Sequence, residues 1–227
     1  MHVFKPNETS MTEHLPETDR TRLRRLHQRG HFDRVTINAI LDVQPMCSVG
    51  YVIDGKPYVT PTLQWREGGH VYWHGSSASR MLRQSRGHEV CLTVAILDGF
   101  VMARSGFHHS VNSRSVMLFG VAEPVPEEEK EAKLNAFIDG LWPGRAATLR
   151  PNNAQELKAY SLLSMKIEEG SAKIRTGGPN DDAEDYAWPV WAGVLPVATQ
   201  TGVPEPDPRN LPGIDAPGYL TAMPRRW

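Results

Sequence analysis

Residues 70–121 read HVYWHGSSASRMLRQSRGHEVCLTVAILDGFVMARSGFHHSVNSRSVMLFGV, and this stretch decides the fold. Its apolar segments have the alternation and β-branched residues that are typical of strands. Two turns separate them, Gly75 to Arg80 and His108 to Ser115, and each turn is rich in hydroxyl groups and carries an arginine. Two cationic, hydroxyl-lined turns around one β-like segment suit a small phosphorylated ligand held on a sheet.

Composition limits the classes of protein that the chain can represent. It has 227 residues, 40% of them apolar, which suffices for one large all-β or α+β domain. The net charge is −1 and the pI is near 6.8, so a nucleic-acid partner, which needs a basic surface, is not expected. No segment approaches the about 18 apolar residues of a membrane span, and the N-terminus lacks a signal-peptide h-region. We therefore expect a soluble, cytoplasmic protein with no membrane partner.

Turn residues and hydrophobic periodicity divide the chain into elements. Asp54-Gly55 predicts a hairpin, and Pro57 and Pro61 place the returning strand near an edge or a bulge. Cys47 and Cys91 lie in apolar runs and are expected to be buried, reduced thiols. The predicted strands are 46–53, 56–65, 70–74, 89–97, 114–123 and 160–176, and the predicted helices are 19–28, 34–42, 80–86 and 126–139.

This pattern predicts a mainly β protein, a six-stranded antiparallel barrel with flanking helices. Closure into a barrel removes the exposed edges that an open six-stranded sheet would leave. We divide the chain into an extended N-terminal arm (1–17), the barrel domain (18–197) and an extended C-terminal tail (198–227). The apolar segment 188–196, which contains Trp188 and Trp191, is expected to dock on the barrel.

Two segments are candidates for holding a phosphate. In the first, Gly75 to Arg80, serine hydroxyls, backbone N–H groups and one guanidinium could bind it together, although the segment lacks a Walker pattern and also fits an ordinary serine-rich turn. The second is Ser110 to Ser115, with Arg114. Two arginines on one dianion would outweigh any neutral contact, but spacing alone leaves open whether the turns converge.

Other chemistry is less well supported by the residues. His74, His108 and His109 have no H-E-x-x-H or C-x-x-C companion, so no metal site is predicted. A Cys91–His109 nucleophile and base pair is disfavoured because Cys91 lies within a buried-looking strand. Trp188 and Trp191 are either packing residues or the wall of a pocket for a planar aromatic ligand.

Several stretches together resemble the pyridoxamine 5′-phosphate oxidase-like flavoproteins, the FMN-binding split barrels, and in particular their nitroimidazole-resistance and flavin-nucleotide-binding branch. Their order and spacing carry the resemblance over most of residues 20–197. The stretches are Asp33 to Leu41, Pro57 to Thr62, Val71 to Ser76, Ser79 to Leu82, His109 to Val116, Phe119-Gly120 and Trp191 to Pro196.

The resemblance implies a six-stranded split barrel that forms a homodimer, with FMN in a groove between the two protomers. It implies that backbone groups of the 59–63 strand line the isoalloxazine ring, that 74–77 lie beside the ring and ribityl chain, and that a cationic group from each turn holds the phosphate. The implied cofactor-binding residues are Val59, Thr60, Pro61, Thr62, Leu63, His74, Gly75, Ser76, Ser77, Ser79, Arg80, His109, Ser113, Arg114 and Trp191. Trp191 would cover the ring from the partner subunit, and His74 could donate a proton.

The sequence departs from the family pattern at three points. Arg80 stands where many relatives have lysine, and Ser113 stands where an aromatic residue often precedes the arginine. No convincing set of pyridoxal-phosphate-binding residues is found near the C-terminus, so vitamin B6 oxidation is not expected.

The expected function is therefore that of an FMN-dependent oxidoreductase acting on a small molecule. The alternative is a flavin carrier without turnover, or a split barrel that binds haem or a deazaflavin, since three histidines are available. A nucleic-acid-binding small barrel is disfavoured by the neutral charge.

Overall fold

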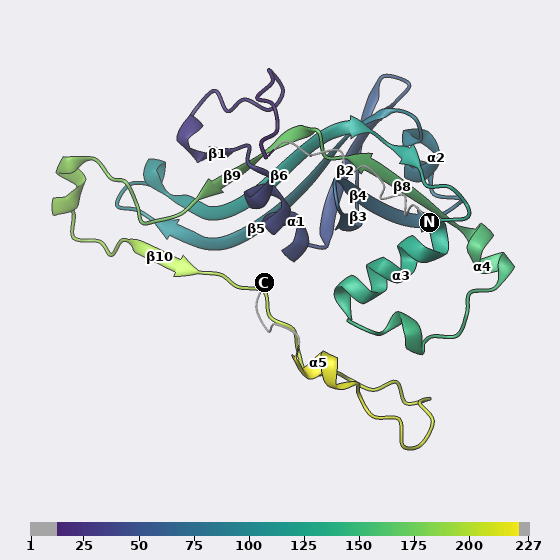
Figure 1. Cartoon of the computed structure of the whole chain (residues 1–227). Coiled ribbons are helices and arrows are strands. Elements are labelled where there is room, and N and C mark those ends of the chain that lie inside the picture. The colour runs from purple at the N-terminus through teal and green to yellow at the C-terminus, as the bar shows by residue number, and fades with distance from the viewer. Residues whose placement is uncertain (1–12, 223–227) are drawn as a thin grey trace, which may run out of the picture.

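The strand β3 (Lys56–Glu67) joins the two halves of the sheet in the computed structural model, which describes residues 13–222 (Figure 1). Its first part pairs with β2 (Met46–Ile53), from Ile53↔Lys56 to Met46↔Leu63. Its last four residues pair instead with β4 (His70–Ser76). The β2–β3 hairpin turns on Asp54 and Gly55, both at positive φ, as two-residue turns that match strand twist require.

The sheet is antiparallel throughout and returns on itself. The strand order is β1-β9-β6-β5-β2-β3-β4-β8-β7, and β10 adds to β5. The strands β8 and β9 follow one another in the chain, yet β8 pairs with β4 and β9 with β6. The short connection between them therefore links the two sides of the sheet near the ends of the strand order. The remaining strands are β1 (Gly30–His31), β5 (Glu89–Met102), β6 (Ser110–Val121), β7 (Glu123–Pro124), β8 (Tyr160–Lys166), β9 (Glu169–Arg175) and β10 (Gly193–Pro196).

The predicted mainly β, split-barrel fold is confirmed, with a different strand count. The six predicted strands are all present, and the last of them divides at residues 167–168 into β8 and β9. Three short strands that periodicity could not reveal, β1, β7 and β10, complete the ten. Strands of two residues, such as β1 and β7, or of four, such as β10, have too few positions for an alternating pattern to be recognised.

Alternation along β5 fills the barrel interior. Val90, Leu92, Val94 and Ile96 are buried, and a bulge at Asp98 then interrupts the pairing with β6. A bulge inserts one unpaired residue into a strand and re-aims its neighbours. The interior also holds Trp73, which is fully buried.

Helices close the barrel on its flanks. In α1 (Arg34–Val43), the Asp33 carboxylate accepts a hydrogen bond from the N–H of Thr36 at 2.8 Å, an N-cap, and Ile37 and Leu41 enter the core. The longest helix, α3 (Lys130–Leu141), packs Phe137 on a second cluster outside the barrel. The other helices are α2 (Arg80–Ser85), α4 (Ala154–Ala159), α5 (Gly218–Ala222), and the 3-10 turns η1 (His27–Arg29), η2 (Gly106–His108), η3 (Ala146–Thr148) and η4 (Ala183–Ala187). None of the helices within 13–222 has the length and apolar character needed to cross a bilayer.

The predicted helix over 19–28 is wrong. The segment contains turns and only η1, with Leu26 at φ 53 and exposed. Arg20 binds Glu169 and Glu89, and the Thr18 hydroxyl donates to Glu169, so the segment is held to the barrel by its polar groups. Clustered arginines and two leucines gave a helical period without an apolar face large enough to stabilise a helix.

The ends of the chain differ in part from expectation. Most of the predicted N-terminal arm, residues 1–12, lies outside the described residues, but Leu15 is buried and its N–H donates to the carbonyl of Phe32 at 2.8 Å. The segment 188–196 docks through the backbone of β10, while Trp188 and Trp191 stay exposed. The tail is extended as far as α5, with residues 223–227 beyond the description.

Substituting Gly170→Ala should destabilise the protein by about 1–3 kcal/mol. A Cβ there would lie 2.7 Å from the backbone oxygen of Met117, so relief needs movement of β6 against β9. Gly140→Ala is the matched control, because nothing lies within 4 Å of its Cβ and alanine favours the helix, so it should be neutral or stabilising. Urea unfolding would measure both, and equal effects would contradict the tight β6–β9 contact.

Candidate functional site

The barrel is split where β4 leaves β3. Beyond the Gln64↔Trp73 pair, β4 continues along β8 alone, with His74, Gly75 and Ser76 opposite Leu162, Ser161 and Tyr160. Residues 59–63 of β3 therefore have β2 on one side and, among the described residues, no strand on the other. A side-chain link spans the split, from the Thr62 hydroxyl to the carbonyl of His74 at 3.4 Å. Free backbone groups along this edge can meet a planar ligand that has its own donors and acceptors.

The loop after β4 keeps its hydroxyl groups available. The N–H groups of Ser77, Ala78 and Ser79 all donate within the protein, to the Ala159 carbonyl and to Ser76. Ser79 occupies the N-cap position of α2, but its hydroxyl accepts no cap hydrogen bond. In residues 13–222 the hydroxyls of Ser77 and Ser79 have no hydrogen-bond partner, so they can bind a ligand.

Arg80 lies over β3 and has no carboxylate partner in the described part of the chain. Its guanidinium is 4.8 Å from the ring centroid of Tyr58, which stacks on Tyr51 at 5.7 Å. The Tyr51 hydroxyl in turn bonds the Thr60 hydroxyl at 3.1 Å. This cation–π contact brings Arg80 to the strand predicted to line the ligand. Sequence reasoning missed Tyr58, although Tyr51 and Tyr58 flank the Asp54-Gly55 turn symmetrically.

The structure does not bring Arg114 to Arg80 within one protomer. Residues 110–115 form the start of β6 rather than a turn, and Arg114 lies opposite Ile96. Arg80 lies over Tyr58, which pairs with Tyr51, and the adjacent Gly50 pairs with Cys91 of β5. Ile96 is five residues farther along β5 than Cys91, which corresponds to about 17 Å of strand. The guanidinium of Arg114 donates two hydrogen bonds to the carboxylate of Asp98, the residue at the bulge, from Nη2 at 2.7 Å and from Nε at 2.9 Å. This contact raises the pKa of Arg114. A role for Ser113 and Arg114 in binding phosphate stays a prediction.

The remaining predicted residues lie at the far end of the β5–β6 hairpin. The exposed Trp191 covers Gly193, where a Cβ would lie 2.7 Å from the ring. His109 precedes β6, and its Nδ1–H donates to the carbonyl of Ser105 at 2.8 Å. Cys91 pairs with Phe119 near the other end of β5, so a Cys91–His109 pair does not form in this protomer.

Both thiols are shielded from reaction. Burial raises the pKa of Cys47 to about 12 and also raises the pKa of Cys91. A thiol that resists ionisation is a poor nucleophile.

His74 points into the cluster between β4 and α3. Its ring lies 5.2 Å from that of Phe137 and 5.9 Å from that of Trp65. Burial lowers the pKa of His74, and its Nδ1 is buried without a hydrogen-bond partner among the residues described. The imidazole is therefore neutral at pH 7, which works against the predicted role as a proton donor in its charged form.

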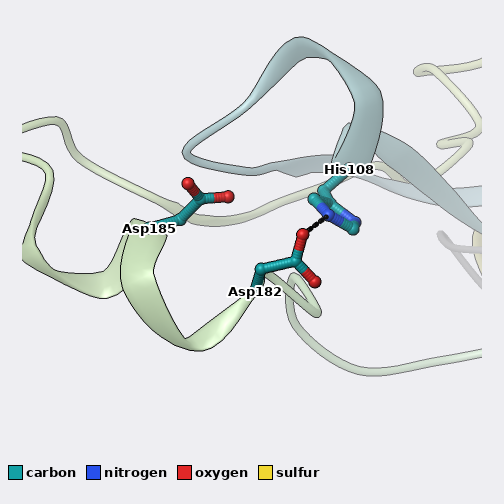
Figure 2. Close-up of side chains that lie close together, drawn as sticks. All are labelled: His108, Asp182 and Asp185. Carbon is teal, nitrogen blue, oxygen red and sulfur yellow. Dashed lines mark hydrogen bonds and ion pairs between the residues drawn. The ribbon is translucent and has the colours of Figure 1, made fainter.

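A histidine and two carboxylates that the sequence did not connect meet beside η4 (Figure 2). His108 Nε2 lies 3.4 Å from Asp182 Oδ2, and the ligand atoms of His108, Asp182 and Asp185 all lie within 4.8 Å of one another. Nearby, the buried Asp181 carboxylate accepts from the backbone N–H and the guanidinium of Arg104, which fixes the two loops together. Asp182 is 74% exposed, and its contact with His108 suffices to bring this histidine and Asp182 together without a metal.

The family model described as pyridoxamine 5′-phosphate oxidase matches residues 33–174. The chain belongs to this family. The matched residues contain β2 to β8, the split and the loop that carries Arg80. The family resemblance of the sequence is thereby confirmed.

Solved structures extend the comparison. The flavocytochrome Anf3 from Azotobacter vinelandii is 49% identical, with a TM-score of 0.87 over 90% of this chain and 96% of that one. The FAD and heme binding protein from Mycobacterium smegmatis is 35% identical, with a TM-score of 0.83 over 87% and 98%. A Bacteroides thetaiotaomicron protein with a suspected role in 5-nitroimidazole resistance shares the fold, at 21% identity and a TM-score of 0.52 over 64% and 86%. Curated protein sequences gave no match.

Acidification should destabilise the protein in a way that depends on His74. Because the folded pKa is lowered, the unfolded state binds more protons near the ordinary imidazole pKa of about 6.5, and the stability is lost as pH falls below that value. His70, whose pKa is lowered by burial and then by Lys166, should add to the slope. His74→Phe, which suits the aromatic cluster, should flatten the dependence in urea unfolding between pH 5 and 8.

The control is His27→Gln, an exposed residue outside the cluster. It should leave the slope unchanged. An unaltered slope in His74→Phe would show that the buried imidazole does not carry the effect.

Proposed function

We propose that this member of the pyridoxamine 5′-phosphate oxidase family binds a flavin at the split beside β3 and acts as an oxidoreductase on a small molecule. One observation carries the proposal. Arg80, which has no carboxylate partner in residues 13–222, lies 4.8 Å from the ring centroid of Tyr58, the residue of β3 that precedes the stretch 59–63 with its unpaired edge. The names of the two relatives with 49% and 35% identity, a flavocytochrome and a FAD and heme binding protein, agree with it.

The residues at the split fit the FMN moiety that FMN and FAD share. Arg80 would hold the phosphate with the hydroxyls of Ser77 and Ser79, which have no other partner in residues 13–222. Charge-assisted hydrogen bonds to an anion are about twice as strong as neutral ones. The backbone of Val59 to Leu63 would meet the polar edge of the ring. Flavin bound there would supply the redox chemistry, while the chain supplies orientation and electrostatics.

A haem, which the sequence analysis gave as an alternative to the flavin, is a second candidate ligand that the names of the two relatives support. Among the described histidines, His109 fits it best. Its Nδ1–H donates to the carbonyl of Ser105, so Nε2 carries the free lone pair. Histidines that bind metals almost always donate their other ring N–H to such a partner. The exposed Phe107 beside it offers apolar surface to a porphyrin.

A homodimer would complete the flavin site. Trp191 and the split lie at opposite ends of β5 within a protomer, so only a second copy could bring this ring to the flavin. The β5–β6 hairpin and the segment around β10 expose large apolar side chains of the kind that a subunit interface covers. These are Leu97, Phe100, Met102, Val111, Trp188, Val190, Trp191 and Leu195.

Flavin binding should depend on Arg80. The apo protein titrated with FMN should bind it with quenched flavin fluorescence, and Arg80→Ala should weaken binding by about 10- to 100-fold, the loss of one charge-assisted contact. Arg114→Ala decides the open question, since unchanged affinity would assign this arginine to Asp98 alone. Sedimentation of the flavin-bound protein would give its mass and show whether it is a dimer.

Failure of the wild-type protein to bind flavin would refute the proposal. Anaerobic reduction of the bound flavin by NADH or NADPH, followed by oxidants, would separate an oxidoreductase from a carrier.

Haem binding should depend on His109. Protein reconstituted with haemin should show a Soret band, and His109→Ala should lose or shift it while the flavin absorbance stays. His88→Ala, an exposed histidine at the start of β5, is the control. If the Soret band is the same in His109→Ala and the wild type, another residue binds the haem iron.

A further inference from the structure

We infer that residues 24–29, the basic loop, bind the surface of an anionic bilayer and place Leu26 among its lipids. The inference goes beyond the proposed function, because none of these residues belongs to the proposed flavin site. It also revises the expectation from the sequence that the protein has no membrane partner. In Figure 1 the N-terminal part of the described chain, drawn in purple, stands out from the barrel beside β1.

The base of the basic loop is fixed to the barrel. Leu23 and Gly30 meet where the loop begins and ends, since a Cβ on Gly30 would lie 3.3 Å from a methyl carbon of Leu23. Arg20 binds Glu169 at the start of β9, and Gly30 pairs with Lys173 farther along the same strand. Both flanks of the loop are therefore anchored on β9, and the residues between them can face solvent.

The cations of the basic loop are not neutralised within the protein. The segment 20–31 contains five arginines and no acidic residue, although the chain as a whole is nearly neutral. The two arginines that precede the loop bind carboxylates, but Arg24, Arg25 and Arg29 form no ion pair among the described residues. Lys173, opposite Gly30 on β9, is exposed and equally unpaired there. A group of four basic residues is sufficient to attract an anionic bilayer.

A further guanidinium adds positive charge behind the basic loop. Arg175 is 9% exposed and donates to Asn112 Oδ1 and to the carbonyls of Gly177 and Gly178, but it has no carboxylate partner in the described chain. Burial, and then the nearby charge of Arg29, lower the pKa of Arg175. Two neighbouring cations without a counter-ion favour an anion in front of them.

Leu26 distinguishes a bilayer from other anionic partners. Its side chain is 43% exposed although cations surround it in the sequence, and its φ of 53° is a left-handed conformation that leucine rarely adopts. The N–H of Arg29 donates to the carbonyl of Leu26 at 2.9 Å and so holds this turn. An apolar side chain among cations gains free energy at the boundary between headgroups and acyl chains, whereas it gains nothing from a nucleic-acid backbone in water.

The size of the basic loop favours a bilayer over an acidic protein. A specific protein interface buries about 800 Å² on each partner and uses about 20–30 residues of each. The basic loop has six residues, and β9 adds one exposed lysine. A bilayer requires no shape complementarity, so a small loop with four cations and one leucine can bind it.

Co-sedimentation of the full chain with vesicles tests the inference. The protein should bind vesicles of phosphatidylglycerol and phosphatidylcholine in equal parts, and not vesicles of phosphatidylcholine alone. Arg24→Ala/Arg25→Ala should weaken this binding by about 30-fold, because each basic residue near an anionic surface contributes a factor of about five. Leu26→Asn should weaken it by about fivefold through lost apolar burial, and asparagine tolerates the positive φ, so the loop keeps its shape.

The matched control is Lys56→Ala/Lys158→Ala, which removes the same charge from exposed residues of β3 and α4 that form no ion pair in residues 13–222. It should change vesicle binding by less than about twofold. Equal weakening by the two double variants would show that net charge, and not the basic loop, drives the binding.

The remaining outcomes are also decisive. Failure of the wild type to bind the anionic vesicles, or equal binding to both kinds of vesicle, refutes the inference. If the arginine variant loses binding but Leu26→Asn does not, the loop holds a polyanion at its surface and the assignment to a bilayer is overturned. Titration of Arg24→Ala/Arg25→Ala with FMN should give the wild-type affinity, so the flavin proposal stands or fails separately.

Discussion

The divided pairing of β3 is the constraint on which the rest of the structure depends. Eight of its residues are held by β2 and four by β4, so the strand must leave one of its edges unpaired for part of its length. An unpaired edge in a sheet normally invites aggregation. Here Pro57 and Pro61 lie in the unpaired half, where a missing N–H costs no ladder bond. The same half can therefore stay open and offer its remaining backbone groups to a ligand.

Electrostatics then divides the arginines into two populations. Those near carboxylates fix structure: Arg20 holds the N-terminal segment to β9, and Arg104 fixes the loops at η2 and η4 through a buried aspartate. Those on α2 have no such partner in the described chain, and an aromatic ring supports only the first of them. A nearly neutral protein with unpaired arginines on one short helix has a local site for an anion without a basic surface overall.

Much of this arrangement could be read from the sequence, and the reasons for the exceptions are physical. The long strands, the Asp54-Gly55 hairpin and α1 follow from period, turn residues and the Asp33 cap. The helix predicted over 19–28 does not form, and Arg20 in this segment binds the distant carboxylates of Glu89 and Glu169, which no local pattern reveals. The local turn predicted the place of Arg80 in the chain, and its contact with Tyr58 on β3 is a tertiary one that the turn does not reveal. Its role in binding a phosphate stays a prediction. The engagement of Arg114 by Asp98 was missed because a bulge, not a spacing, sets it.

The bulge at Asp98 also determines which residues of the β5–β6 hairpin face inward. Before it, the even-numbered residues Val90, Leu92, Val94 and Ile96 are buried; after it, the odd-numbered Gly99, Val101 and Ala103 are. The inserted residue thus reverses the parity of the strand and turns Phe100 and Met102 outward. Because the bulge absorbs Asp98 as an extra residue, Gly99 takes the inward place that regular alternation would give to Asp98. If the strand were straightened with Asp98 kept in the ladder, every later side chain of β5 would exchange the interior for the surface, whereas a chain that lacked Asp98 could keep the same residues inside with no bulge at all.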